Sequence, residues 1–218
     1  MIIKNDPRRL LIHQLKAFYG DEVQTQAITD EIYCRVIEKM DLCFSKIRNK
    51  YFHQDGENLF SALHTVQWTM FLYQMARTLF LLSPENRELC DQIYGISKMI
   101  SSADLYYEVE MPAIWTFDHP QGSVMGRARY SNYFSFDQAC TVGNNKGVYP
   151  TIGEYVAMKS GSKILGNSHV GDHVIMAANS YIIDTDIPSY SIVFGMPPYN
   201  TIHPITRQKY DEIITNWN

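Results

Sequence analysis

The sequence predicts an α+β protein in which an N-terminal α-helical domain is followed by a parallel β-helix and a short C-terminal helix. Within residues 124–184, apolar side chains return every six residues with one interruption. Before Ser102 they recur at the spacing of amphipathic helices, and after it that period disappears. A six-residue spacing of this length fits neither a helix of period 3.6 nor a strand of period 2. It is typical of a coil in which each hexapeptide forms one face of a triangular prism.

The six-residue repeat has two phases separated by an insertion. Its members are Tyr130, Phe136 and Val142, followed by Ile152, Met158, Ile164, Val170, Met176 and Ile182. The ten-residue step from Val142 to Ile152 equals one repeat plus four residues, which predicts an outward loop at 144–150. The fifth residue of each later hexapeptide is small or β-branched and would fill a tight corner of the coil. These residues are Val156, Ser162, Ser168, Val174 and Ser180.

Four helices are predicted before Ser102. The first begins at Asp6-Pro7, an N-cap followed by proline at the first helical position, and ends at Gly20. The other three are expected within residues 21–51, 59–82 and 88–101. The stretch 68–82 is the most apolar, but it is too short to span a bilayer and is interrupted by polar residues, so we expect a buried helix.

The remainder of the chain is expected to be extended until its last residues. Residues 104–117 contain Tyr, Val, Met, Ile and Trp in short extended pieces, which predicts the first coil of the β-helix. Pro188 and Pro197-Pro198 end the repeat, and Pro204 opens the last helix. The predicted domains are therefore a helical domain at 1–102, a β-helix at 103–200 and a C-terminal helix at 201–218.

Composition excludes several classes of partner. The chain has 218 residues, 45% of them hydrophobic, and a net charge of -4 without any basic block. We therefore expect no nucleic-acid partner and no membrane insertion. Residues 1–9 carry charges without an apolar core behind them and cannot serve as a secretory signal, so a cytoplasmic location is predicted.

No metal site or disulfide framework is predicted. Cys34, Cys43, Cys90 and Cys140 show no Cys-x-x-Cys pairing, which suits reduced thiols. Cys140 occupies the small-residue position of its hexapeptide and is expected to be inert packing. His169 and His173 are four residues apart, but in a β-helix such residues do not share a face as they would on an α-helix.

Several segments carry a resemblance to a known family. Val142-Gly143, Ile152-Gly153, residues 162–167, Val170-Gly171 and residues 194–197 are similar to left-handed β-helix acyltransferases. Residues 118–122, which read Asp-His-Pro-Gln-Gly, narrow the resemblance to the bacterial serine acetyltransferase family over about residues 55–200. The resemblance implies a left-handed hexapeptide-repeat β-helix and acetyl-CoA as the cosubstrate.

His119 is the candidate catalytic base. Acetyl transfer to a hydroxyl needs a group that removes the proton as the thioester is attacked, and imidazole titrates near the working pH. Asp104 lies fifteen residues earlier, the spacing at which the resembled family places the aspartate that orients its histidine. The alternative for Asp104 is a cap on the end of the preceding helix. Because Pro120 follows His119, an extended backbone is expected there.

The acceptor-binding residues follow the resemblance less closely. Asp118 matches a family aspartate that contacts the amino group of serine. Asp55 resembles a second one, but the match is weak and an Asp-Gly turn is the favoured explanation for Asp55. Tyr149 stands with Val148 where the family has the Arg-His pair that binds the serine carboxylate. We therefore expect weak binding of L-serine, unless another cation such as Arg127 or Arg129 replaces that pair. A sugar hydroxyl of a surface-polysaccharide precursor is the alternative acceptor.

The donor-binding candidates are small residues that would line a groove for the pantetheine arm of acetyl-CoA between adjacent prisms. They are Gly143, Ser160, Gly161, Ala177 and Ala178, and tight coil corners explain each of them equally well. Lys159 and Lys163 could approach the CoA phosphates or be solvated charges.

The predicted function is an acetyl-CoA-dependent O-acetyltransferase, with a catalytically inactive scaffold or assembly protein as the alternative. An isolated prism offers only half of a CoA groove, and we expect it to expose apolar side chains around Tyr133 and Phe134. A homotrimer is therefore predicted, with a hexamer formed from two trimers as a further possibility.

Overall fold

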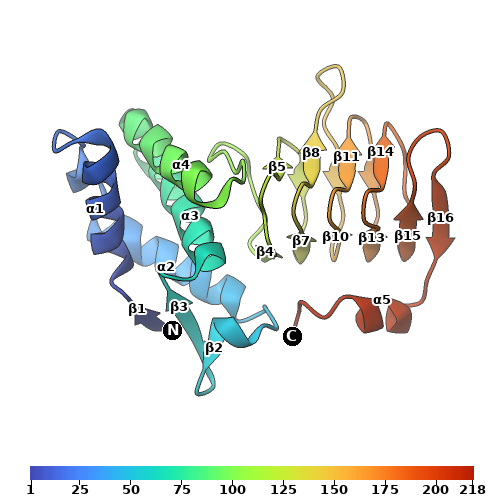
Figure 1. The fold of residues 1–218 in the computed structure, drawn as a ribbon, viewed down its shortest axis with the longest axis horizontal. Coiled ribbons are helices and arrows are strands. Elements are labelled where there is room, and N and C mark those ends of the chain that lie inside the picture. Colours follow the sequence, from blue (N-terminus) through green and yellow to red (C-terminus); the bar gives the residue numbers. More distant parts are fainter. The chain divides into compact units, whose positions relative to one another are not determined.

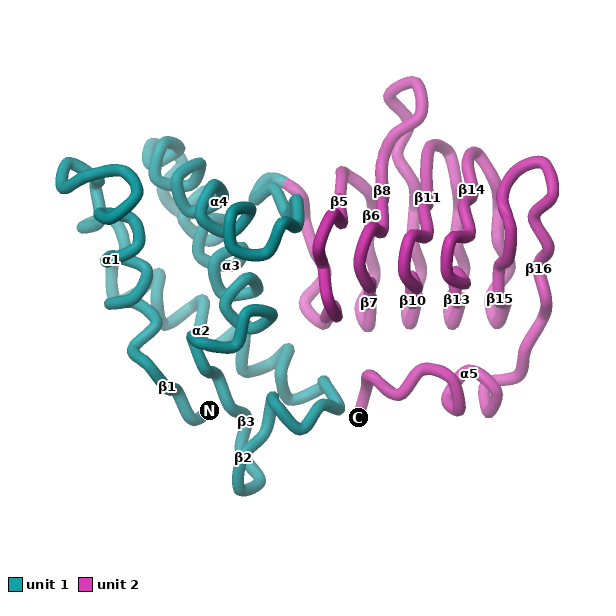
Figure 2. The backbone as a smooth tube through the Cα atoms, in the orientation of Figure 1, with its two compact units in different colours: residues 1–108 teal, residues 109–218 magenta.

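The computed structural model describes all 218 residues, and the chain divides into two compact units, Met1–Glu108 and Val109–Asn218 (Figures 1 and 2). We name them the helical unit and the solenoid unit. The first holds four α-helices and a small sheet, and the second holds the β-helix and the last helix.

The four predicted helices of the helical unit are present. They are α1 (Pro7–Tyr19), α2 (Asp30–Phe44), α3 (Thr65–Leu82) and α4 (Arg87–Ser101), with short 3-10 turns at Thr25–Ala27, Lys50–Phe52 and Pro84–Asn86. The first cap is as predicted, because the Asp6 carboxylate accepts the backbone N–H of Arg9 at 3.1 Å and Gly20 ends the helix. Helix α2 starts later than the pattern suggested, since Thr29 caps it by accepting the N–H of Ile32.

A three-stranded sheet in the helical unit was not predicted. Its strands are β1 (Ile2–Lys4), β2 (His53–Gln54) and β3 (Glu57–Ser61), in the order β1-β3-β2. Strand β1 pairs in parallel with β3, and β2 forms a hairpin with it through Asp55-Gly56, both of which have positive φ. The buried helix α3 fills the centre of the unit, where Trp68 stacks on Phe71.

The solenoid unit consists of three sheets whose strands succeed one another around the coil (Figure 1). The first sheet holds β4 (Trp115–Phe117), β7 (Phe134–Phe136), β10 (Ala157–Met158), β13 (Val174–Met176), β15 (Ser191–Phe194) and β16 (Thr201–Pro204). The second holds β5 (Val124–Met125), β8 (Thr141–Gly143), β11 (Lys163–Leu165) and β14 (Tyr181–Ile183). The third holds β6 (Arg129–Tyr130), β9 (Thr151–Ile152) and β12 (His169–Val170). All pairings are parallel except β15 with β16.

The hexapeptide register is confirmed at the level of single side chains. From Phe136 to Ile182 every repeat member is buried, and Val142, Ile152 and Ile164 have no exposed surface. The five small or β-branched residues predicted for the corners are all 0% exposed. Tyr130, the first member, is only partly buried, and its hydroxyl donates to Gly126 O. The insertion at 144–150 projects from the coil as an outward loop after β8 (Figure 1).

The C-terminal segment covers the outer face of the first sheet. Helix α5 (Arg207–Ile213) and the residues after it pack Tyr210 and Ile214 against Ala157 and Ile175. One corner of each coil carries an aromatic residue with positive φ, and these rings stack along the coil in the order Tyr133, Tyr155, His173 and Tyr190.

The expected exposed face around Tyr133 and Phe134 is therefore wrong. Phe134 points into the coil and has no exposed surface. Tyr133 stacks on Tyr155 with ring centroids 4.2 Å apart, and Trp217 of the C-terminal segment meets it edge-on at 5.5 Å. The apolar surface that suggested a partner chain is covered by the chain itself.

His173 makes the packing of α5 sensitive to pH. Its Nε2 lies 3.1 Å from Arg207 Nη1, and because arginine only donates, that bond requires a neutral imidazole. Burial and then the Arg207 charge lower the pKa of His173, against smaller opposing effects of Asp172, Asp211 and Glu154. The folded state therefore binds fewer protons than the unfolded state once the pH falls below about 6.5, so stability decreases there, by at most about 1.4 kcal/mol per pH unit.

We expect His173→Phe, which retains an aromatic ring in the stack, to flatten this pH dependence. Thermal unfolding at pH 7.5 and at pH 5.5 should show a larger decrease in midpoint for the wild-type chain than for the variant. His169→Phe is the matched control, because His169 is exposed, lies on β12 of the third sheet and pairs with Asp186. Equal decreases in the wild type and His173→Phe would show that His173 does not carry the effect.

Candidate functional site

His119 lies at a corner of the first complete coil, directly after the buried strand β4. Its side chain is exposed, and the corner is closed by Gln121 N–H donating to His119 O at 2.9 Å and Ser123 N–H donating to Pro120 O at 3.0 Å. The expected extended backbone is wrong, because φ of His119 is 50°. The sharp turn between two sheets needs a left-handed residue, and this outweighs the preference that Pro120 imposes.

The coils place most of the donor-groove candidates on the same edge as His119. Strand β4 is followed in its sheet by β7, β10 and β13, with Phe117 paired to Phe136, and Met158 paired to Phe136 and Met176. The residues after these strands therefore lie one above another: Asp118-His119, Asp137-Gln138, Lys159-Ser160-Gly161 and Ala177-Ala178. Backbone bonds continue this ladder, for example Asp118 N–H to Phe136 O and Lys159 N–H to Met176 O. We name this line of corners the His119 edge.

Two of the small candidates differ in what the fold requires of them. Gly161 has φ 74°, and an added Cβ would lie 2.4 Å from Asn179 Oδ1, so the packing of that side chain favours glycine there. Gly143 lies at the other end of β8, away from the His119 edge, and an added Cβ would meet only Leu165 Cδ2 at 3.4 Å. Packing therefore explains Gly161 but leaves Gly143 without a structural reason to be glycine.

Asp104 lies in the helical unit, where side chains of α4 hold its carboxylate. Tyr94 donates its hydroxyl to Asp104 Oδ1 at 2.7 Å, and Lys98 Nζ lies 2.7 Å from Oδ2. Burial and then the bond to Asp104 raise the pKa of Tyr94, which stays a neutral donor. These contacts fix the position of the carboxylate, and its role in orienting His119 stays a prediction.

The acceptor candidates occupy three different places. Asp118 is exposed beside His119 at the His119 edge. Asp55 is exposed in the β2–β3 hairpin of the helical unit with φ 53°, and Gln54 Nε2 donates to its carboxylate at 3.2 Å. This geometry is the Asp-Gly turn that was considered as the alternative. Tyr149 is exposed in the outward loop, which two backbone bonds between Asn145 and Val148 close.

An ion pair at the His119 edge was missed by sequence reasoning. Lys159 Nζ lies 2.9 Å from Asp137 Oδ2, and the Asp137 side chain is only 17% exposed. The two residues are 22 positions apart, which is three hexapeptides plus the four-residue insertion. That register was available in the sequence, and it would have placed the lysine directly above the aspartate.

Cys140 is packing, as predicted. It has no exposed surface, its Sγ lies 3.3 Å from Lys159 O, and burial raises the pKa of its thiol. His169 pairs with Asp186, whereas His173 stacks between Tyr155 and Tyr190. No group of three or more His, Cys, Asp or Glu side chains is arranged to hold a metal ion.

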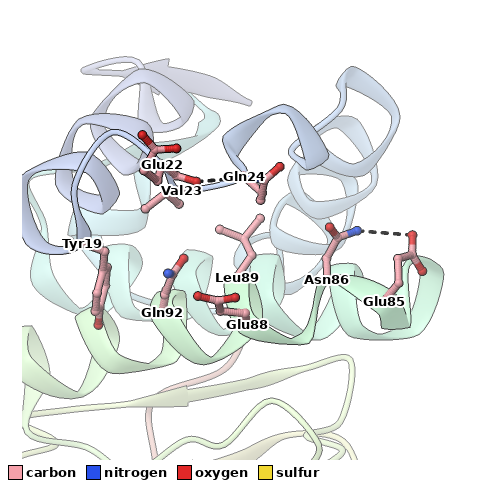
Figure 3. Close-up of a pocket in the computed structure, with 9 residues that line it drawn as sticks. All are labelled: Tyr19, Glu22, Val23, Gln24, Glu85, Asn86, Glu88, Leu89 and Gln92. Atoms are coloured by element: carbon pink, nitrogen blue, oxygen red, sulfur yellow. Dashed lines mark hydrogen bonds between the residues drawn. The ribbon is translucent and has the colours of Figure 1, made fainter.

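A cavity of about 210 Å³ lies in the helical unit, between the segment after α1 and the start of α4 (Figure 3). Carboxylates of Glu22, Glu85 and Glu88 line it with Tyr19 and several amides. Asn86 Nδ2 donates to Oε1 of the adjacent Glu85 at 3.3 Å on one side of the cavity. None of the predicted site residues lines this cavity.

The chain is similar to serine acetyltransferases. No family model matches it. The serine acetyltransferases of Staphylococcus aureus (strain N315) and Staphylococcus epidermidis (strain ATCC 12228) are each 27% identical to it over 121 residues, 48% of this chain and 51% of theirs. The chain thus spans about half the length of the curated relatives it matches.

Solved structures extend the likeness to nearly the whole chain. A serine acetyltransferase in complex with cysteine has a TM-score of 0.71 at 21% identity and covers 97% of this chain and 84% of its own. The serine acetyltransferase of Vibrio cholerae O1 biovar El Tor N16961 has a TM-score of 0.70 at 18% identity, and the match covers 97% of this chain and 83% of that one. A serine acetyltransferase in complex with CoA has a TM-score of 0.68 at 20% identity, and the match covers 90% of this chain and 83% of that one. The predicted fold class and the predicted resemblance are confirmed. None of the helices has both the length and the apolar character required to cross a bilayer.

Proposed function

We propose that this chain is an acetyl-CoA-dependent O-acetyltransferase that acts on the hydroxyl of L-serine. The observation that carries the proposal is the exposed imidazole of His119 on an edge built from the small residues Ser160, Gly161, Ala177 and Ala178. Such an edge leaves room for an extended donor whose thioester ends beside the imidazole. The names of the relatives and the CoA complex of a similar structure support the same donor.

The reaction requires one base and no covalent enzyme intermediate. His119 removes the hydroxyl proton while the oxygen attacks the thioester carbonyl, and backbone N–H groups of the edge stabilise the oxyanion. The intermediate collapses with cleavage of the carbon–sulfur bond, and His119 returns the proton to the sulfur as CoA leaves. Asp104 would orient the imidazole and stabilise its protonated form. Asp118 and Asp55 would bind the amino group of the acceptor.

Two other functions are possible for this chain: acetylation of a sugar hydroxyl, and an inactive scaffold. Tyr149 and Val148 offer no charge to a carboxylate, which favours a sugar hydroxyl as the acceptor. A hexapeptide-repeat coil can retain its fold without the chemistry, which also suits an inactive scaffold. Thiol release from acetyl-CoA, measured with L-serine and with a panel of sugars, separates these functions: release with serine supports the proposal, release with a sugar selects the second acceptor, and no release selects the scaffold.

Asp104→Asn should reduce acetyl transfer, but by less than the loss of His119, because it weakens orientation and charge while the base remains. The matched control is Asp91→Asn, since Asp91 also accepts a tyrosine hydroxyl in the helical unit, from Tyr107 at 2.7 Å. Steady-state turnover of both variants decides the question. Full activity of Asp104→Asn would restrict Asp104 to holding Tyr94 and Lys98.

The active species is proposed to be a homotrimer, and two trimers could join as a hexamer. One chain supplies the His119 edge, and a neighbouring prism would supply the second wall of the donor groove, with Gly143 among its lining residues.

A further inference from the structure

The ion pair between Asp137 and Lys159 has no task in the mechanism above, although it shares the His119 edge. Asp137 follows β7 and Lys159 follows β10, the two strands that succeed β4 in the sheet. Asp137 is therefore on the coil next to that of Asp118 and His119, and Lys159 is on the coil after it. The Lys159 side chain is 39% exposed, so its ammonium group remains accessible to a ligand.

The Lys159 side chain points toward the coil of His119. Adjacent strands of a sheet lie about 4.8 Å apart, so the backbone of Lys159 is about 10 Å from that of Asp118. Its ammonium group, however, is bound to Asp137 on the coil between them. Within the corner segments 118–123, 137–140, 159–162 and 177–180, Lys159 is the only lysine or arginine.

Asp137 binds Lys159 but leaves part of the hydrogen-bonding capacity of the lysine ammonium group unused. An ammonium group has three N–H donors, and the carboxylate at 2.9 Å takes one of them. A second anion can therefore bind the remaining donors while the pair stays intact. Because Asp137 is mostly covered, it fixes the cation in place before a ligand arrives, which lowers the entropy lost on binding.

We propose that Lys159 is the specificity-determining cation that binds the carboxylate of an amino-acid acceptor, an inference that rests on the proposed O-acetyltransferase function. A β-hydroxy-α-amino acid then finds a complementary group for each of its three polar groups. Asp118 meets the ammonium, His119 takes the hydroxyl proton and Lys159 binds the carboxylate.

Arg127 and Arg129, the cations that the sequence offered in place of the Arg-His pair, are placed less well for this role. Arg127 lies between β5 and β6, and Arg129 lies on β6, so both stand one corner further along the coil than the His119 edge. The weak binding of L-serine expected from Val148-Tyr149 is replaced here by the expectation that serine binds through Lys159.

The test compares the wild type with Lys159→Met, which retains the length of the side chain without its charge. We expect the KM for L-serine to rise by about tenfold or more, as for the loss of a charge-assisted bond. The KM for acetyl-CoA should change less than twofold. The wild type should prefer L-serine to its methyl ester, and the variant should not. Lys209→Met, which breaks a surface pair with Glu212, is the matched control.

The measurements distinguish binding of the serine carboxylate from binding of the CoA phosphates, and a loss of folding from a loss of function. A raised KM for acetyl-CoA with an unchanged KM for serine would assign Lys159 to the CoA phosphates and overturn the proposal. Calorimetric titration with L-serine needs no turnover: binding that weakens in Lys159→Met supports the inference even if no acetyl is transferred, whereas equal binding, or none in the wild type, overturns it. Should Lys159→Met unfold because Asp137 loses its partner, the double variant with Asp137→Asn removes both charges and repeats each measurement.

Discussion

His119→Ala should lower the rate of acetyl transfer by about a hundredfold or more, because a positioned general base contributes at least that factor. The variant should fold normally, since the imidazole is exposed and the left-handed backbone at this corner is open to alanine. Ala139 already adopts that conformation with φ 56°. The loss should appear in kcat, with the KM for acetyl-CoA little changed, because the imidazole acts in the transition state and not on the donor's remote parts.

Two further variants make the result specific. His119→Asn tolerates the left-handed backbone better than alanine and cannot act as a base, so it should be as slow as His119→Ala. His169→Ala removes an exposed histidine of the same unit from a pair with Asp186 and should remain fully active. Unchanged turnover in either His119 variant would remove His119 from the mechanism and with it the main support for the proposed function.

The solenoid could be predicted in detail because its geometry is local. A six-residue step returns each side chain to the same orientation, so the burial of Ile164 or Ser162 follows from sequence spacing alone. The same reasoning fails for contacts between distant segments. Tyr133 looked exposed because nothing near it in the sequence covers it, whereas Trp217 does so from 84 residues away. The small sheet of the helical unit was missed for the same reason, since Ile2 pairs with Leu59.

Some residues of the candidate site could be predicted from the sequence, and others could not. The position of His119 follows from motif and register together, and the same register stacks Ser160 and Ala177 above it. The Asp137–Lys159 pair required counting through the loop insertion, which sequence reasoning did not do. The partners of Asp104 could not be predicted, because the position of its carboxylate depends on how the chain turns after α4.

The solenoid should associate through the face of the sheet β5-β8-β11-β14. Inward residues of this sheet, such as Val142 and Ile164, are fully buried, so their neighbours in the strands point outward. Those outward residues form two rows: Val124, Thr141, Lys163 and Tyr181 in one, and Gly143, Leu165 and Ile183 in the other. The C-terminal segment covers the first sheet, and the third sheet presents Arg129, Thr151 and His169. The second sheet is therefore the more apolar of the two faces that remain for another copy.

Leu165→Glu should break that association and abolish acetyl transfer, because a charge in a closed apolar interface is not solvated and the donor groove loses its second wall. Light scattering should give three times the 25.2 kDa of the chain for the wild type and the single-chain mass for the variant. Thr151→Glu adds the same charge to the outward face of the third sheet and should remain trimeric and active. A wild-type mass of about 25 kDa in an active preparation would contradict the trimer, and it would require one chain to hold the whole donor beside His119.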